Sequence, residues 1–325
     1  MNLGKTGLQV SRIGLGTWAI GGGPAWGGDN ALTDSLEVIR SCPNMGVNLI
    51  DTAPAYNFGN SEVILGQALK GMKRESLVII TKCGITWTRE GSLFNKVGDR
   101  QLYKNLSKES ISEELQSSLQ RLGVNTIDIY MTHWQSVEPF FTPIAETMDF
   151  LCELKYKGLI KGIGAANVTH EHVKEYLKYG HLDIVQGKYS ILDRGNEDTL
   201  IPLCREKGIT FQAYSPLEQG LLSGSIGRAY IPPGGSAQKN KKWFQPDKLP
   251  KAIDMLEKWN SLCHKYQCTV ANLAIAWLLK QGEHINVLSG STTKAQLEEN
   301  IKALSIPLTD MDAADMRRWA EDADR

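Results

Sequence analysis

Short apolar runs that alternate with helical segments are the feature that most constrains the fold of this chain. Several of the helical segments end at a glycine just before the next run, as at Gly46, Gly158, Gly180 and Gly208, which fits the residue that follows a helix. The runs lack strict apolar–polar alternation, which is typical of strands buried on both faces of a parallel sheet. The predicted strands are 12–18, 47–50, 77–82, 127–131, 160–164, 183–187, 209–214 and 285–289.

The segments between these strands predict the helices that would surround them. Asp29 or Asn30 is expected to cap the first helix. Residues 2–11 predict a two-stranded hairpin. The predicted helices are 31–45, 61–70, 109–122, 143–157, 169–178, 197–207, 269–281 and 294–303, with 251–266 and 309–321 as extra helices outside the repeat.

Eight strand–helix units favour a (β/α)8 barrel over an open doubly wound sheet. A Rossmann sheet needs a glycine-rich turn between a strand and a helix. Gly14 and Gly16 lie inside the first strand with no third glycine at the required spacing, and Gly21–Gly23 does not complete that motif either. We therefore expect one domain over 1–325: a TIM barrel with an N-terminal β-hairpin and extra C-terminal helices.

Composition excludes several classes of partner. The chain has 36 Lys plus Arg and 36 Asp plus Glu, and this balance argues against nucleic acid or an anionic membrane surface. No apolar stretch approaches the roughly 20 residues that cross a bilayer. Six scattered cysteines without CxxC spacing predict reduced thiols and a cytoplasmic location. The six histidines form no ligand set, so we expect no metal and disfavour a zinc hydrolase barrel.

Two long connections interrupt the alternation, 83–107 after the third predicted strand and 215–250 after the seventh. Connections of this length inside a compact domain are usually functional, and both leave the strand ends at which barrel active sites lie. Aromatic residues in the first predict a substrate wall, and small residues in the second predict a segment that folds over a ligand. The alternative interpretation is a mobile surface loop.

Four titratable residues are predicted at one rim of the barrel. Asp51, Lys82 and His133 follow or end three different strands, and Tyr56 lies on the adjoining loop. A phenol has a pKa of about 10, which a neighbouring ammonium group lowers. A carboxylate balances that ammonium, and an imidazole can orient a substrate oxygen. The set predicts a general acid that protonates a developing alkoxide. The alternative is a structural Lys–Asp pair beside a packed histidine.

These residues lie in motifs that resemble those of the aldo-keto reductases, which are NAD(P)-dependent (β/α)8 enzymes without a Rossmann domain. The resemblance covers nearly the whole chain. Its motifs are Gly14–Trp18, Leu49–Ala53 with Tyr56, Thr81–Lys82, Asp128–Trp134, Gly162–Asn167, Gln186 with Tyr189–Ser190, Ala213–Leu217 and Leu297–Asn300.

The resemblance implies a role for each of the four residues. Tyr56 would be the proton donor, Lys82 would lower its pKa, Asp51 would hold Lys82, and His133 would orient the carbonyl. Relatives that reduce carbon–carbon double bonds carry Glu at the position of His133, which favours carbonyl reduction here.

The implied cofactor is NADPH or NADH. Asn167 and Gln186 match residues that bind the nicotinamide carboxamide, and Tyr214 matches the ring that stacks on it. Ala166 departs from the family, where many relatives have Ser. The other implied cofactor-binding residues are Ser215, Leu217, Gln219, Gly220 and Leu222 over the pyrophosphate, Ser289, Gly290, Ser291, Thr292, Gln296, Glu299 and Asn300 at the adenosine, and also Thr17, Trp18, Asp51 and Pro216.

Two of these positions bear on cofactor choice. NADP-specific relatives often place Lys or Arg at the positions of Gly290 and Gln296, where this chain is uncharged, and this makes NADH a candidate. Lys294, or the lysines of the second long connection, could replace those charges. The alternative is that these lysines form a solvated surface. Those of the connection are Lys239, Lys241 and Lys242.

The implied substrate is a small carbonyl compound. Gly21–Trp26, Ser92–Arg100 and Met131–Gln135 resemble bacterial members that reduce methylglyoxal and similar small aldehydes. The alternatives are a sugar or polyol dehydrogenase of the same family and a cofactor-binding regulatory subunit, as in potassium-channel β-subunits. The sequence makes no prediction of oligomeric state. The predicted substrate pocket contains Trp18, Tyr56, Trp87, His133 and Trp134.

Overall fold

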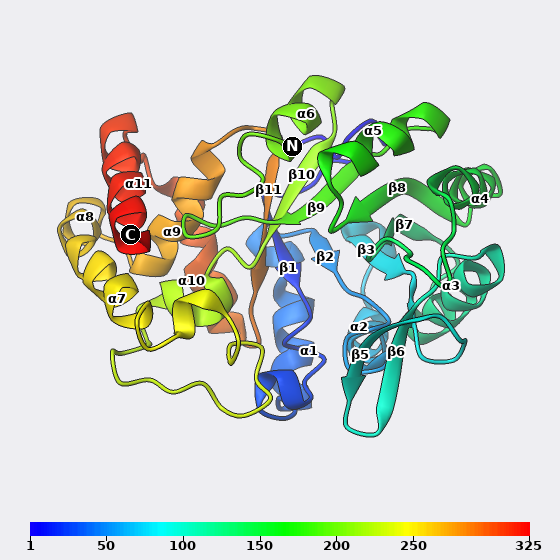
Figure 1. The fold of residues 1–325 in the computed structure, drawn as a ribbon, viewed down its shortest axis with the longest axis horizontal. Helices are drawn as coiled ribbons and strands as arrows, with labels where there is room; N and C mark the ends of the chain where they lie inside the picture. Colours follow the sequence, from blue (N-terminus) through cyan, green and yellow to red (C-terminus); the bar gives the residue numbers. More distant parts are fainter.

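A closed barrel of eight parallel strands forms the centre of the computed structural model, which describes all residues from 1 to 325 (Figure 1). Neighbouring strands follow the order β1-β11-β10-β9-β8-β7-β3-β2, and pairing of β1 with β11 and with β2 closes the ring. The predicted barrel is therefore confirmed. Its strands are β1 (Ile13–Gly16), β2 (Leu49–Asp51), β3 (Val78–Cys83), β7 (Ile127–Thr132), β8 (Ile160–Ala166), β9 (Ile184–Lys188), β10 (Thr210–Tyr214) and β11 (Ile285–Gly290).

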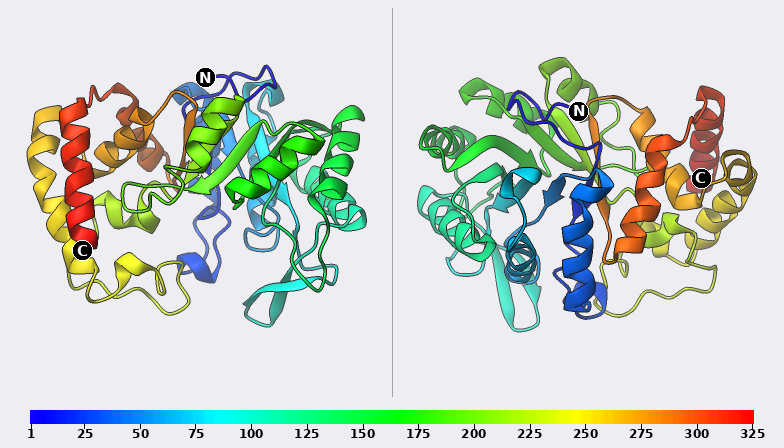
Figure 2. Two further views of the ribbon diagram at one scale, coloured as in Figure 1. Left: turned by 45° about the horizontal axis from the view of Figure 1, so that its top comes forward. Right: turned by 180° about the vertical axis from the view of Figure 1, so that it is seen from behind.

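Helices surround the barrel, and three additional ones pack together on one side of it (Figures 1 and 2). The surrounding helices are α1 (Leu32–Ser41), α2 (Asn60–Leu69), α3 (Lys108–Leu122), α4 (Ile144–Tyr156), α5 (His170–Tyr179), α6 (Leu200–Lys207), α9 (Val270–Lys280) and α10 (Lys294–Ile301). The additional ones are α7 (Leu249–Lys258), α8 (Asn260–Tyr266) and α11 (Asp310–Asp324). Short 3-10 helices are η1 (Pro24–Trp26), η2 (Pro43–Met45), η3 (Arg74–Ser76), η4 (Glu218–Ser223), η5 (Lys242–Phe244) and η6 (Lys302–Ser305). None of the helices has the length and apolar character that a membrane span requires.

The cap predicted at the start of the first helix is wrong. Ala31 precedes α1 without a side-chain cap, because Asp29 accepts a hydrogen bond from the backbone of Gly23 and Asn30 donates to the carbonyl of Ala19. Gly180 follows α5 as predicted, in extended backbone. A Cβ there would lie 2.4 Å from Cε of Met148, so a larger residue would have to displace the end of that side chain.

Residues 1–10 close the barrel at the end opposite the long connections (Figure 1). The predicted hairpin is reduced to one antiparallel bridge between Asn2 and Gln9, supported by the backbone bond from Leu3 to Leu8. Leu3 and Val10 are buried in one cluster with side chains from inside the barrel, including Ile129. The hairpin therefore seals one end of the barrel core and leaves the other end for a site.

The connection after β3 forms a three-stranded antiparallel sheet that is absent from the predicted elements. β4 (Ile85–Thr86), β6 (Arg100–Lys104) and β5 (Ser92–Val97) pair in that order. Gly98 and Asp99 form the two-residue turn between β5 and β6, with Gly98 at a φ of 60°. A Gly–Asp pair between two strand-like runs is a hairpin signal, so the sheet could have been found from the sequence.

Glu114 of α3 fixes the start of this sheet. Its two carboxyl oxygens accept hydrogen bonds from the backbone nitrogen of Gly84 at 3.0 and 3.1 Å, and Ser110 donates to one of them at 3.2 Å. Burial raises the pKa of Glu114 to about 8. At neutral pH this carboxyl group therefore largely keeps its proton in the folded protein.

Glu114 is expected to make stability depend on pH. The folded protein binds this proton more tightly than the unfolded chain, so the contribution of Glu114 to the free energy of unfolding falls as pH rises from about 4.5 to about 8. Glu114→Gln keeps an acceptor for Gly84 and removes the titration. In urea unfolding, the free energy of unfolding of the variant minus that of wild type should rise by a few kcal/mol, in order of magnitude, between pH 5 and pH 9. Glu109→Gln, at an exposed site on the same helix, is the control. A difference that does not change with pH would contradict the assignment.

Candidate active site

The four predicted titratable residues meet at one end of the barrel. β2 ends at Asp51, Lys82 is the penultimate residue of β3, and His133 follows the last residue of β7. Nζ of Lys82 lies 2.5 Å from Oδ1 of Asp51 and donates to the phenol oxygen of Tyr56 at 3.1 Å. The ring centroids of Tyr56 and His133 are 5.7 Å apart. Barrel closure thus brings together side chains that lie up to 82 positions apart in sequence, from 51 to 133.

The Lys82–Asp51 pair is fully buried, with both side chains 0% exposed. The ammonium group can donate three hydrogen bonds, and it has three acceptors: Asp51, Tyr56 and the carbonyl of Thr52 at 2.9 Å. Oδ2 of Asp51 accepts from Nε2 of Gln186 at 2.8 Å. Every polar atom of the pair has a protein partner, so its geometry is set before any ligand binds.

The pKa of Tyr56 is raised well above its ordinary value, first by burial and then by the negative charge of Asp51. Lys82 donates to the phenol oxygen and so favours the phenolate, but burial and the charge of Asp51 outweigh this effect on the net pKa. The role expected of Lys82 stays a prediction. The phenol keeps its proton at neutral pH, and because Lys82 donates to its oxygen, the O–H bond is left to point at another acceptor.

His133 is a neutral imidazole at neutral pH, because burial and then the nearby charge of Lys82 hold its pKa well below the usual range. Its Nδ1 is buried and has no hydrogen-bond partner within the protein. Buried polar atoms are nearly always paired, so the unpaired Nδ1 of this buried imidazole is unusual.

Aromatic side chains surround the four residues in two layers. The ring of Trp18 lies 6.2 Å from that of Tyr56 and packs edge-on against Trp26 at 5.1 Å. The other two predicted pocket residues lie one layer further out: Trp87 contacts Phe58, and Trp134 contacts Phe94. Trp18, Tyr56 and His133 thus form the inner wall.

The residues expected to hold a nicotinamide carboxamide have a free hydrogen-bond donor and a free acceptor for it. Asn167 donates to the carbonyl of His133 at 2.9 Å and accepts from the Tyr214 hydroxyl at 2.8 Å. Nε2 of Gln186 donates to Asp51 and to Gln212. The second N–H of Asn167 and Oε1 of Gln186 have no partner within the protein, and together they are the donor and acceptor that a carboxamide needs. The residues present therefore fit a nicotinamide cofactor.

The predicted pyrophosphate segment follows β10 in an unusual backbone conformation. Ser215, Glu218 and Gln219 have φ values of 56°, 46° and 50°, a region that non-glycine residues seldom adopt outside functional loops. Gln219 is held on both sides: its side chain donates to Ser215, and its carbonyl accepts from Gln238. Its Oε1 is buried without a partner. The segment contains all the predicted belt residues, namely Ser215, Pro216, Leu217, Gln219, Gly220 and Leu222.

The predicted adenosine end lies after β11. Asn300 donates to the hydroxyls of Ser289 and Ser291 at 2.8 and 3.2 Å, which ties α10 to the end of the strand. Oε1 of Gln296 accepts from the backbone of Thr292 at 2.8 Å. Gly290 is exposed. Glu299 forms an ion pair with Lys302 and accepts from Thr269, so this carboxylate is already engaged.

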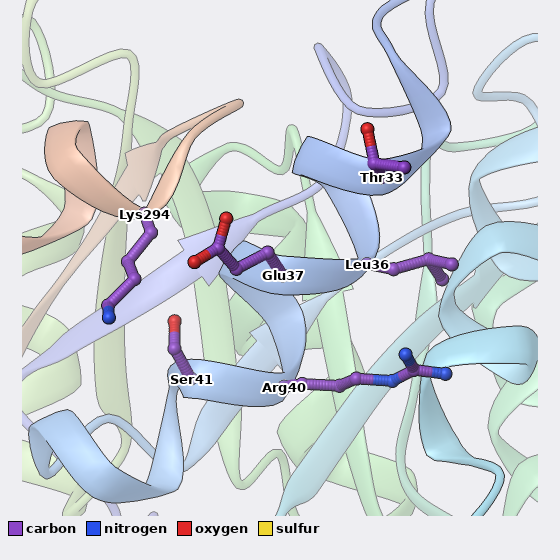
Figure 3. A pocket seen from close by; sticks show the side chains of 6 residues that line it. All are labelled: Thr33, Leu36, Glu37, Arg40, Ser41 and Lys294. Atoms are coloured by element: carbon purple, nitrogen blue, oxygen red, sulfur yellow. The ribbon is translucent and has the colours of Figure 1, made fainter.

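Two of the lysines that could replace the missing charges, Lys294 and Lys242, have acidic neighbours. Lys294 lines an open pocket between α1 and α10, where it lies across from Glu37 and Ser41 (Figure 3). Its ammonium group is 3.7 Å from Glu298. Lys242 of the long connection pairs with Asp324. This pocket contains none of the four central residues and only one apolar side chain, Leu36, and is a charged groove on the outer surface.

Sequence reasoning missed an amide chain inside the barrel. Gln186 donates to Gln212 at 2.5 Å, Gln212 donates to Asn286 at 2.8 Å, and Asn286 donates to the carbonyl of Ser11 at 2.9 Å. The chain connects Asp51 to the closed end of the barrel. The sequence does contain a sign of this chain, because Gln212 and Asn286 are polar residues inside mainly apolar strands.

Buried polar residues behind β2 and β3 were also missed. The hydroxyl of Ser61 lies within hydrogen-bonding distance of those of Thr17 and Thr52, which places Thr17 behind Asp51 rather than facing the barrel opening. Glu62, which is fully buried, accepts from Thr81 at 2.5 Å and from Arg121 at 2.7 Å. These contacts tie Thr52, after β2, and Thr81, the neighbour of Lys82 on β3, to α2 and through Arg121 to α3. Contact of Thr17 with a cofactor stays a prediction.

Comparison with known proteins agrees with this geometry. Residues 12–321 match the model of the aldo/keto reductase family. The chain is 62% identical to the NADH-specific methylglyoxal reductase of Escherichia coli K12, over 99% of this chain and 98% of that protein. It is 34% identical to the aldo-keto reductase YhdN of Bacillus subtilis, over 91% and 86% of the two chains. Among solved structures, a glycerol dehydrogenase from Gluconobacter oxydans superposes with a TM-score of 0.85 at 28% identity, over 97% of this chain and 92% of its own. The chain belongs to the aldo/keto reductase family of NAD(P)H-dependent oxidoreductases.

Proposed function

We propose that this protein reduces a small aldehyde or dicarbonyl compound, such as methylglyoxal, to the alcohol, with Tyr56 as the proton donor. The observation that carries the proposal is the position of Lys82, whose ammonium group bonds Asp51 and the Tyr56 phenol at the same time. The 62% identity to a methylglyoxal reductase supports the choice of substrate. The free cysteines support a cytoplasmic location, and the extent of the family match, 12–321, supports a single domain.

Each of the four residues has a defined task in this proposal. When bound, NAD(P)H supplies the hydride that reduces the carbonyl carbon. The neutral imidazole of His133 donates a hydrogen bond to the carbonyl oxygen and orients it. Tyr56 transfers its proton to that oxygen as negative charge develops there, because an alkoxide is far more basic than a phenolate. Lys82 stabilises the resulting phenolate through the 3.1 Å bond, and Asp51 keeps Lys82 charged inside the barrel.

Turnover tests this function. Purified protein mixed with methylglyoxal and NADH should consume the cofactor, followed by the absorbance of its reduced nicotinamide. The glycerol dehydrogenase among the structural neighbours favours one alternative, oxidation of a polyol by the same residues. A panel that includes glycerol with NAD⁺ measures this reverse direction. Absence of turnover in both directions with both cofactors would contradict the proposal and favour a regulatory subunit.

We further propose NADH as the preferred cofactor. No Lys or Arg occupies position 290 or 296, and Gln296 is bonded to Thr292. The 2′-phosphate of NADPH would therefore meet no fixed positive charge from these two positions. The NADH specificity named for the Escherichia coli relative supports this preference.

Gln296→Arg is expected to shift cofactor use toward NADPH. Hydrogen bonds to a charged group contribute roughly 1.5–3 kcal/mol, so the ratio of kcat/KM for NADPH to that for NADH should rise about tenfold or more. Steady-state kinetics with methylglyoxal and each cofactor measure the ratio. Gln116→Arg, at an exposed position on α3, adds the same charge elsewhere and should leave the ratio unchanged. A wild-type protein that prefers NADPH would contradict the proposed preference.

A further inference from the structure

One face of β6 presents two cations to the loops that carry the active-site residues. Side chains alternate along a strand, so Arg100 and Lys104 share a face. Nζ of Lys104 lies 5.0 Å from the ring centroid of Trp134, the neighbour of His133. Cζ of Arg100 lies 4.8 Å from the ring centroid of Phe58, two residues after Tyr56. Both cations therefore lie over aromatic side chains of the loops that follow β7 and β2.

Lys104 is half-buried and has no anionic partner. Its ammonium group forms no ion pair or hydrogen bond, and burial alone lowers its pKa, with no carboxylate opposing the shift. Other partly buried lysines differ: Lys188 pairs with Asp193 and Glu218, and Lys248 pairs with Asp324. Removing a cation from water without a counter-charge is unfavourable, and the cation–π contacts with Phe94 and Trp134 offset only part of that cost.

Arg100 adds a second unpaired cation on the same face. It is exposed and forms no ion pair, while its guanidinium group stacks on Phe58. Phe58 packs edge-on against Trp87 at 5.6 Å, and Phe94 packs against Trp134 at 5.7 Å. Two aromatic pairs, each covered by a cation from β6, thus form the outer layer around the inner wall of Trp18, Tyr56 and His133.

We propose that Lys104, assisted by Arg100, binds an anionic group of the substrate and so determines specificity. The substrate class is an aldehyde or ketone that carries a carboxylate or phosphate group a few atoms from its carbonyl. The carbonyl lies at Tyr56 and His133, and the anion supplies the counter-charge that Lys104 lacks. This inference rests on the proposed reductase function and names the substrate class of the same site.

Matched pairs of substrates test the subsite. Succinic semialdehyde is compared with butanal for the carboxylate, and glyceraldehyde 3-phosphate with glyceraldehyde for the phosphate. In each pair the wild-type kcat/KM is expected to be about tenfold or more higher for the anionic member at low salt, and the preference should shrink as salt screens the charge. The pair with the larger ratio identifies which anion the subsite accepts.

Lys104→Gln is expected to lower kcat/KM for the anionic member of each pair about tenfold or more, through a higher KM, and so to abolish the preference. Lys104→Arg keeps the charge and should keep the preference. Lys96→Gln, at an exposed position on β5, is the matched control and should behave as wild type. Equal use of both members of each pair by the wild type, or an unchanged preference in Lys104→Gln, would overturn the subsite while leaving methylglyoxal reduction intact.

Anion binding can also be measured directly, in the absence of any reaction. Titration with succinate or inorganic phosphate should change the tryptophan fluorescence of the wild type, because Lys104 lies over Trp134. The apparent affinity should fall about tenfold or more in Lys104→Gln. If neither anion binds wild type, the subsite is wrong. If an anion binds through Lys104 but no carbonyl compound is reduced, the subsite stands as an anion site and the reductase function fails.

Discussion

Tyr56→Phe is expected to lower kcat for methylglyoxal reduction by a factor of about 10²–10⁴, which is the usual contribution of a positioned general acid. Phenylalanine keeps the ring between Trp18 and His133 and removes only the hydroxyl group that bonds Lys82. Because the substrate then has no proton donor at 56, the chemical step slows while binding is retained. Steady-state kinetics with NADH in excess measure the loss.

Two further measurements separate chemistry from folding. Cofactor binding, followed by quenching of protein fluorescence, should change little in Tyr56→Phe, because this ring carries no predicted contact with the adenosine end. Tyr179→Phe, at an exposed position at the end of α5, should leave kcat unchanged. A Tyr56→Phe protein that turns over methylglyoxal within about threefold of wild type would show that the proton comes from another group.

Lys82→Met is expected to lower both activity and stability. The variant leaves the Asp51 carboxylate fully buried without its cation, and breaking a buried ion pair in this way costs about 3–5 kcal/mol. It also removes the donor to Tyr56, so kcat should fall as far as in Tyr56→Phe. Urea unfolding and steady-state kinetics on the same preparation measure the two losses.

The double variant Asp51→Asn/Lys82→Met distinguishes the two effects. With neither charge present, no buried charge lacks a partner, and the free energy of unfolding should return to within about 1–2 kcal/mol of wild type. Activity should stay as low as in Lys82→Met, since the phenolate still has no donor. A double variant that is less stable than Lys82→Met would mean that Asp51 stabilises the fold through Gln186 rather than through Lys82.

The sequence was sufficient to predict the barrel and the meeting of the four central residues. Strand ends are visible in the chain as the last apolar residue before a polar one, as at Ile50–Asp51. A closed parallel barrel then places every such end at the same rim. No knowledge of distant contacts is needed for that step, which is why residues as far apart as Asp51 and His133 could be assigned to one site.

Properties that depend on packing between distant segments were not predictable in this way. The direction of the Tyr56 pKa shift depends first on how deeply the phenol is buried and then on the charge of Asp51, and no spacing along the chain encodes either of them. The partners of Gln212 and Glu62 are likewise set by which strands and helices become neighbours. The failed cap prediction at Asp29 has the same cause, since the loop containing Gly23 competes for its carboxylate.

The amide chain from Gln186 to Asn286 limits the routes by which a proton can reach Tyr56. Primary amides donate and accept hydrogen bonds but do not release protons near neutral pH. Asp51 is therefore in hydrogen-bond contact with the closed end of the barrel, at Ser11, and yet no proton can travel that way. After each catalytic cycle, the proton that restores Tyr56 has to arrive from the open end, along the route by which the alcohol leaves. Reprotonation and product release thus share one passage, which Trp18 and His133 border beside Tyr56.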